Sequence, residues 1–148
     1  MQRLAHPRTQ LWLVLCSALI IRLAAACWWQ SRLPEDQPFG FGDSDSYWVL
    51  AQSIAHGEPY QYGGPDSRIF RMPGYPTLLA AVFLVAGDQP HVLWARGLGA
   101  LLGAVTVGGV YCLAHSVFDR TAAMIAAILA TFYPGAVAMA IFVLSETA

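Results

Sequence analysis

Residues 11–29 read LWLVLCSALIIRLAAACWW, and this apolar stretch decides the class of the protein. A helix needs about 20 mostly apolar residues to cross the roughly 30 Å of hydrocarbon in a bilayer. Residues 92–118 and 121–144 meet the same criterion, whereas the apolar segment 75–86 is too short. The sequence therefore predicts an all-α integral membrane protein with three transmembrane helices, at residues 11–29, 92–118 and 121–144.

The overall composition also favours a membrane protein. Of the 148 residues, 57% are hydrophobic and 11% are charged, whereas soluble domains carry about a quarter charged residues. The net charge is −1 and lysine is absent, which excludes the clustered basic surface that nucleic-acid binding needs. The cysteines lie in apolar runs without metal-ligand spacing, and we expect them to be buried apolar side chains: Cys16, Cys27 and Cys112.

The arginines predict the orientation in the membrane, because cytoplasmic loops are enriched in Lys and Arg. The N-terminal tail carries Arg3 and Arg8 without an acid, so we expect it in the cytoplasm. Three spans also place Arg120 in the cytoplasm and residues 30–91 outside, whereas a fourth crossing at residues 75–86 would place Arg120 outside. The expected location is the cell (inner) membrane, as a multi-pass protein.

The first span has a second interpretation as a cleaved signal peptide. Residues 24–27 form a small-residue string that resembles a lipoprotein cleavage site. However, Arg22 interrupts the apolar region, and the later spans favour a retained anchor.

Arg22 itself is unusual, because a charged side chain inside a span is costly. Two interpretations stay open. The side chain could snorkel to the outer interface, or it could point at an anionic group in a cavity near that interface.

Two further features concern helix packing. Pro134 predicts a kink in the third span. Small residues at every fourth position of the second span predict close packing against another helix: Gly99 and Gly103, and Ala100, Ala104 and Gly108.

The external segment 30–91 has an internal pattern of its own, which is typical of long loops with a function. Asp43 is a good N-cap and Gly57 a good C′ residue. Four apolar residues between them repeat at the spacing of one helical face: Tyr47, Leu50, Ala51 and Ile54. We therefore predict an amphipathic helix at about residues 44–56 and, after a Pro-Gly-Tyr-Pro break, a second juxtamembrane helix at about residues 75–86.

With this topology, Asp43, Arg71 and Glu146 lie at one membrane surface. A carboxylate can act as general base on an acceptor hydroxyl, and an arginine can hold a phosphate bidentately while it leaves. The set suits transfer from a polyprenyl-phosphate donor. In the simpler interpretation, Asp43 only caps a helix and Arg71 only anchors lipid headgroups.

Asp43 and Asp45 could hold a divalent metal, although two carboxylates are an incomplete site.

Four segments together resemble the membrane-embedded GT-C glycosyltransferases. They are GDSDSYWVLAQSIAHGEPY at 42–60, RMPGYPTLLAAVF at 71–83, the AR-x-L-x-ALLGA-x-T helix from residue 95, and the segment from the YP at 133 to the LSE that ends at 146. The most similar group is that of the bacterial dolichyl-phosphate-mannose–protein mannosyltransferase-like enzymes. It includes the Rgt-type core sugar transferases and is related to the lipid A aminoarabinose transferases.

The resemblance implies a role for each charged residue. Asp43 matches the catalytic base, with Asp45 as the alternative, and Glu146 matches a second acid after the third span. Arg71 stands where relatives carry Lys-Pro-Pro and contact the donor's lipid phosphate, and Arg22 is a second candidate for that phosphate. The implied reaction moves a sugar from a polyprenyl-phosphate-linked donor to a protein, lipid or polysaccharide acceptor outside the membrane. A divalent metal stays possible, because relatives differ in metal use.

Enzymes of this superfamily have more spans, so the resemblance implies that the 148 residues are the N-terminal part of a longer enzyme and are inactive alone. The alternative is a non-catalytic three-helix membrane subunit whose small-residue faces pack against a partner. A transporter half would need acids inside the helices near mid-bilayer, and the predicted spans contain none there.

Overall fold

The structure is a computed structural model that describes residues 7–40, 42–64, 66 and 71–143. Within these ranges the chain consists of helices and connecting loops, without a β-strand. The helices are α1 (Pro7–Gln30), α2 (Gly42–His56), α3 (Gly74–Ala86), α4 (Leu93–Val117), α5 (Arg120–Phe132) and α6 (Pro134–Ile141).

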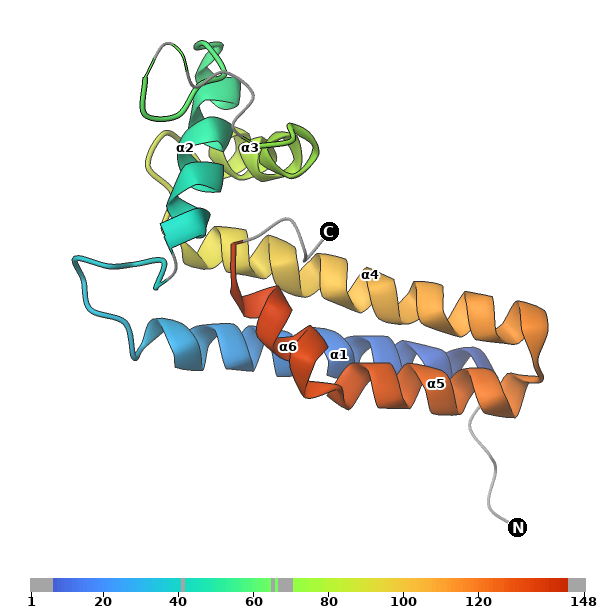
Figure 1. The fold of residues 1–148 in the computed structure, drawn as a ribbon. Helices are drawn as coiled ribbons and strands as arrows, with labels where there is room; N and C mark the ends of the chain where they lie inside the picture. The colour runs from blue at the N-terminus through green and yellow to red at the C-terminus, as the bar shows by residue number, and fades with distance from the viewer. Residues whose placement is uncertain (1–6, 41, 65, 67–70, 144–148) are drawn as a thin grey trace.

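The helices form two groups, as Figure 1 shows. In the first group, which we call the helical layer, α1 packs along α4, α4 packs along α5, and α6 contacts both α1 and α4. In the second group, which we call the head, α2 packs against α3 at the end of the layer where α4 begins. The predicted helices at 44–56 and 75–86 correspond to the two helices of the head.

Two helices of the layer are long and apolar enough to cross a membrane, α4 and the segment Thr9–Gln30 of α1. A third crossing is possible if α5 and α6 count as one broken span, because they are joined at a bend of 51°. Helix α3 is apolar but only 13 residues long. The chain is therefore all-helical within the described residues, with two or three helices that could span a membrane.

The bend between α5 and α6 confirms the predicted effect of Pro134. A proline has no N–H to donate to the carbonyl four residues earlier, which here belongs to Ala130. Tyr133 adopts an extended backbone conformation, with ψ 114°, and α6 starts at Pro134. The expected single helix at residues 121–144 is therefore a pair of short helices, and α6 ends at Ile141.

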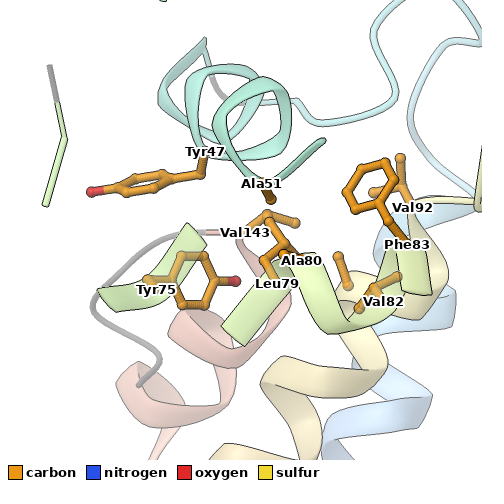
Figure 2. Close-up of a cluster of buried hydrophobic side chains, with 10 residues drawn as sticks. Tyr47, Ala51, Tyr75, Leu79, Ala80, Val82, Phe83, Val92 and Val143 are labelled. Atoms are coloured by element: carbon orange, nitrogen blue, oxygen red, sulfur yellow. The ribbon is translucent and has the colours of Figure 1, made fainter. Parts of the chain in front are cut away.

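The head is held together by one apolar cluster, drawn in Figure 2. The predicted apolar face of α2 is confirmed, because Tyr47, Leu50 and Ala51 are buried and Ile54 packs against the cluster. The remaining buried members come from α3, from the start of α4 and from the end of the described chain: Tyr75, Leu79, Ala80, Val82, Phe83, Val92, Ala95 and Val143.

The ends of α2 confirm one predicted cap and correct the other. Gly57 has a φ of 69°, and the Glu58 N–H donates to the Ser53 carbonyl at 2.8 Å while the Gly57 N–H donates to the Ile54 carbonyl at 3.2 Å. This is the Schellman arrangement that glycine favours. The predicted N-cap role of Asp43 is wrong, because α2 already begins at Gly42 and Asp43 lies in its first turn.

The small residues of α4 pack inside the chain, as predicted. A Cβ on Gly99 would lie 2.7 Å from the Ala140 carbonyl oxygen, and one on Gly103 would lie 2.5 Å from Arg22 Nε. Ala100 and Ala104 are buried. These glycines therefore allow α4 to approach α6 and α1 closely.

The expected burial of the cysteines is wrong. All three are free thiols on the exposed surface of the helical layer: Cys16, Cys27 and Cys112. Large apolar side chains are exposed on the same helices, among them Trp12, Ile20, Val105 and Leu113. A helix that is apolar on every side does not reveal from its sequence which side faces the protein.

Candidate functional site

Asp43 and Arg71, the predicted base and the predicted phosphate ligand, form an ion pair in the head. Arg71 Nη2 donates to Asp43 Oδ1, and Arg71 Nε donates to Ser46 Oγ at 3.4 Å. The side chain of Asp43 is 61% exposed and that of Arg71 is 26% exposed. The structure thus brings two predicted site residues from separate segments together at an open surface.

Two tyrosines fix the position of Arg71. The Tyr60 hydroxyl donates to the Arg71 backbone carbonyl at 2.8 Å. The guanidinium carbon lies 5.2 Å from the centroid of the Tyr47 ring, a cation–π distance. The Tyr47 ring in turn meets the Tyr75 ring edge-on, with centroids 5.5 Å apart. Arg71 is therefore held by its backbone and by its guanidinium against the buried part of the head.

The first turn of α2 also favours the carboxylates. Asp43 and Asp45 both lie in this turn, where the partial positive charge of a helix N-terminus stabilises anions. The Ser46 hydroxyl that meets Arg71 also donates to the Asp43 backbone carbonyl at 2.7 Å. The same turn therefore positions both the carboxylate and a polar neighbour of the guanidinium.

Asp45, the alternative acid, has a different partner. The Tyr62 hydroxyl donates to Asp45 Oδ2 at 3.0 Å. This hydrogen bond, together with the negative charge of Asp45, raises the pKa of Tyr62 above its usual value. Asp45 also lines a cavity of about 400 Å³ formed with residues 36–40 and Gly42. Of the two acids, Asp43 is the one seen paired with the arginine.

Among the described residues, the possible metal site at Asp43 and Asp45 gains no third ligand. In the part of the chain that the structure describes, no group of three or more His, Cys, Asp and Glu side chains could hold a metal ion. Asp43 and Asp45 remain two carboxylates with separate partners, Arg71 and Tyr62.

Arg22 lies in the helical layer, and its hydrogen-bond partners lie in α1 and α5 of the same layer. Its side chain is 1% exposed. It donates to the carbonyls of Ala18 at 3.1 Å, Ala130 at 3.3 Å and Thr131 at 3.5 Å. Ala18 precedes Arg22, so the guanidinium points back along α1 and does not snorkel toward the end of the helix at Gln30. The two candidate phosphate ligands, Arg22 and Arg71, are therefore held by different groups of helices.

Glu146 lies outside the described residues, and so do residues 67–70 just before Arg71. The described chain ends at Val143, which is buried in the apolar cluster of the head.

Arg96, which is not among the candidate residues from the sequence, organises the base of the head. Arg96 is buried, and it donates to Gln30 Oε1 at 2.9 Å and to the carbonyls of Pro38 at 3.0 Å and Ile141 at 2.5 Å. It thus joins the end of α1, the loop before α2 and the end of α6. An arginine in the first turn of an apolar span is the sequence signal that could have indicated this role.

Comparison with known proteins adds no relative: no family model, curated protein or solved structure matches the chain. Any functional assignment therefore depends on the motifs and on the geometry of the head.

Proposed function

We propose that this chain forms the donor-side part of a membrane glycosyltransferase that takes its sugar from a polyprenyl-phosphate carrier. In this proposal the helical layer crosses the cell membrane three times with the N-terminus in the cytoplasm, and the head lies at the external surface. The observation that carries the proposal is the ion pair between Asp43 and Arg71. The sequence alone suggests complementary roles for these two residues, as base and as phosphate ligand, and they lie 28 positions apart in the sequence.

The pair supplies the two groups that sugar transfer requires. The donor phosphate competes with Asp43 for the Arg71 guanidinium, because arginine binds phosphate oxygens bidentately. Asp43 then accepts the proton of the acceptor hydroxyl as its oxygen attacks the anomeric carbon. The bond between the anomeric carbon and the phosphate oxygen breaks, and the departing phosphate keeps the electron pair and remains bound to Arg71.

Other residues orient this pair without reacting. Tyr47 and Ser46 hold the guanidinium beside Asp43. Arg96 fixes the loop that leads into α2, and with it the first turn that carries Asp43. A mobile base or phosphate ligand would lose the positional advantage that enzymes draw from preorganised groups.

The alternative, a non-catalytic subunit, receives less support. It expects the small-residue faces of α4 to pack against a partner, but Gly99 and Gly103 already contact Ala140 and Arg22 of the same chain. The partner would have to use the remaining, larger apolar side chains.

The test measures donor consumption in membranes of cells that express the gene over its full reading frame. Radiolabelled polyprenyl-phosphate mannose and polyprenyl-phosphate aminoarabinose are supplied, and release of free polyprenyl phosphate is followed. We expect release in the wild type and at least a hundredfold loss in Asp43→Asn and Arg71→Gln, at equal protein level. Glu58→Gln, an exposed acid two residues after α2, is the matched control with unchanged release.

Two results would contradict the proposal. Full release by Asp43→Asn would remove Asp43 as the base. If the wild type releases polyprenyl phosphate from no lipid-linked donor, the transferase assignment itself fails.

A further inference from the structure

A cavity of about 640 Å³ lies in the helical layer at the break between α5 and α6. Its walls come from α4, α5 and α6, with Arg22 of α1 as the only charged side chain among them. The other lining residues are small or apolar, except for Thr106 and Tyr133. This cavity shares no lining residue with the Asp43–Arg71 site.

Arg22 brings an uncompensated charge to this cavity. Among the described residues no carboxylate pairs with it, and its Nε has no hydrogen-bond partner. Its terminal nitrogens are bonded to the carbonyls of Ala130 and Thr131 at the C-terminal end of α5. The Ala130 carbonyl has no helical N–H partner, because the residue four positions later is Pro134, which has no N–H. Carbonyls supply only partial charges, so a full positive charge remains buried, which is costly without an anion.

The N-terminus of α6 faces the same cavity and is independent of Arg22. Helix α6 has eight residues and no side-chain cap at its N-terminus. Gly135 and Ala136, in its first turn, both line the cavity. First-turn N–H groups have no partner within their helix and carry the positive end of the helix dipole, an arrangement that binds phosphates and carboxylates. A buried cation and an uncapped helix N-terminus therefore meet at one apolar cavity.

We propose that this cavity binds an amphiphile with a phosphate head, with the head between Arg22 and the α6 N-terminus. The chain of the amphiphile lies along the apolar wall formed by Val107, Val110, Leu129 and Met139. Leu129 is 66% exposed and Met139 is 41% exposed, so the rim is open to the surroundings of the layer, which in the proposed topology are lipid. The cavity volume falls within the range of about 300–1,000 Å³ that is typical of small-molecule sites. A partner helix is about 10–12 Å across, so the cavity would hold little more than one turn of it, and a small amphiphile fits better. The cavity and its charge stand without the transferase proposal, and only the lipid outside the rim is taken from the proposed topology.

The test is binding to the purified 148-residue chain in a neutral maltoside detergent, measured by native mass spectrometry. The probes are dodecyl phosphate, dodecanol and inorganic phosphate, which separate a lipid-borne head from a free anion. We expect one bound dodecyl phosphate, held at least tenfold more tightly than either other probe. Arg22→Gln should reduce dodecyl phosphate binding to the level of dodecanol. Arg120→Gln, an exposed arginine at the far end of α5, is the matched control and should bind as the wild type does.

A second variant keeps the proposal testable if Arg22→Gln does not fold. Ala136→Phe fills the cavity and leaves Arg22 in place, and it should lose binding of dodecyl phosphate and dodecanol alike. Retained phosphate preference in Arg22→Gln, or retained binding in Ala136→Phe, would overturn the proposal. Equal binding of inorganic phosphate would show a free-anion site instead. If the wild type binds dodecyl phosphate no more tightly than dodecanol, the proposal is also overturned. The charge of Arg22 would then be neutralised by an acid on a partner helix.

Discussion

Arg71, in the segment just before α3, pairs with Asp43 in the first turn of α2, and apolar side chains already pack these two helices together. An exposed ion pair of this kind stabilises a fold by only about 0–1 kcal/mol. The cluster around Leu79 and Phe83 holds α2 against α3 without help from charge. Stability alone therefore gives a weak reason for placing an acid and an arginine opposite each other, and a role in binding or catalysis explains the placement better.

The exposure of the Asp43–Arg71 pair predicts a small coupling energy in a double-mutant cycle. Asp43→Asn, Arg71→Gln and the double variant should unfold within about 1 kcal/mol of the wild type, because the pair is exposed. The measured coupling between the two positions should be no larger. Detergent-dependent unfolding followed by circular dichroism gives these values. A loss of several kcal/mol in the single variants would show that the pair is mainly structural, which would contradict its placement for binding or catalysis.

The glycines of α4 provide a prediction with a built-in control. Gly99→Ala places a methyl group 2.7 Å from the Ala140 carbonyl oxygen, and such overpacking typically costs about 1–3 kcal/mol. Gly109→Ala meets nothing within 4 Å and should be neutral or slightly stabilising, because alanine favours helices. The two variants are compared by their unfolding midpoints in the same detergent. Equal midpoints would mean that α4 and α6 are not in close contact.

The sequence was sufficient wherever the relevant information is local. The length of an apolar run predicts a possible span, and the spacing of Tyr47, Leu50 and Ala51 predicts which face of α2 is buried. The break at Pro134 follows from the missing N–H of one residue. The approach of Arg71 to Asp43 was predicted only as a shared surface, not as a contact.

The remaining features depend on partners that are distant in the chain. Besides the local Ala18 carbonyl, the Arg22 guanidinium is held by two carbonyls more than a hundred residues away, at the end of α5. Arg96 has a role only because Gln30, Pro38 and Ile141 come together around it. The exposed cysteines were misjudged because apolar neighbours in sequence do not distinguish lipid-facing from protein-facing positions. The predicted start of α2 at residue 44 lies two positions after the observed start at Gly42, which is the usual uncertainty of a helix boundary.

The pair formed by Tyr62 and Asp45 predicts a titration that can be followed directly. The hydrogen bond to Asp45 and its charge raise the pKa of Tyr62. Because the pKa in the folded state is raised, the stabilising effect is complete below the ordinary tyrosine value of about 10 and is lost as the pH rises through the shifted pKa.

In the ultraviolet titration of tyrosinate, Tyr62→Phe should remove a component that titrates late. Asp45→Asn should move that component to lower pH. Asp43→Asn should move it less, because the charge of Asp43 is the smallest of the contributions. An unchanged titration in Asp45→Asn would show that Tyr62 does not donate to Asp45 in solution.

Arg96 should keep the loop at residues 31–40 ordered, because it donates hydrogen bonds to the backbone of that loop. Arg96→Lys keeps the charge, but a single ammonium group cannot reach Gln30, Pro38 and Ile141 together as the guanidinium does. Hydrogen bonds from charged groups are each worth about 1.5–3 kcal/mol, so the variant should be destabilised by at least that amount.

The destabilisation should appear first as faster amide hydrogen exchange in residues 31–40, because Arg96 donates to the carbonyls of Pro38 and Phe39 in that loop. Arg120→Lys, at an exposed position with one partner, Gln10, is the matched control. If exchange in residues 31–40 is the same in both variants, the loop is held by its own turns, and Arg96 has no part in positioning Asp43.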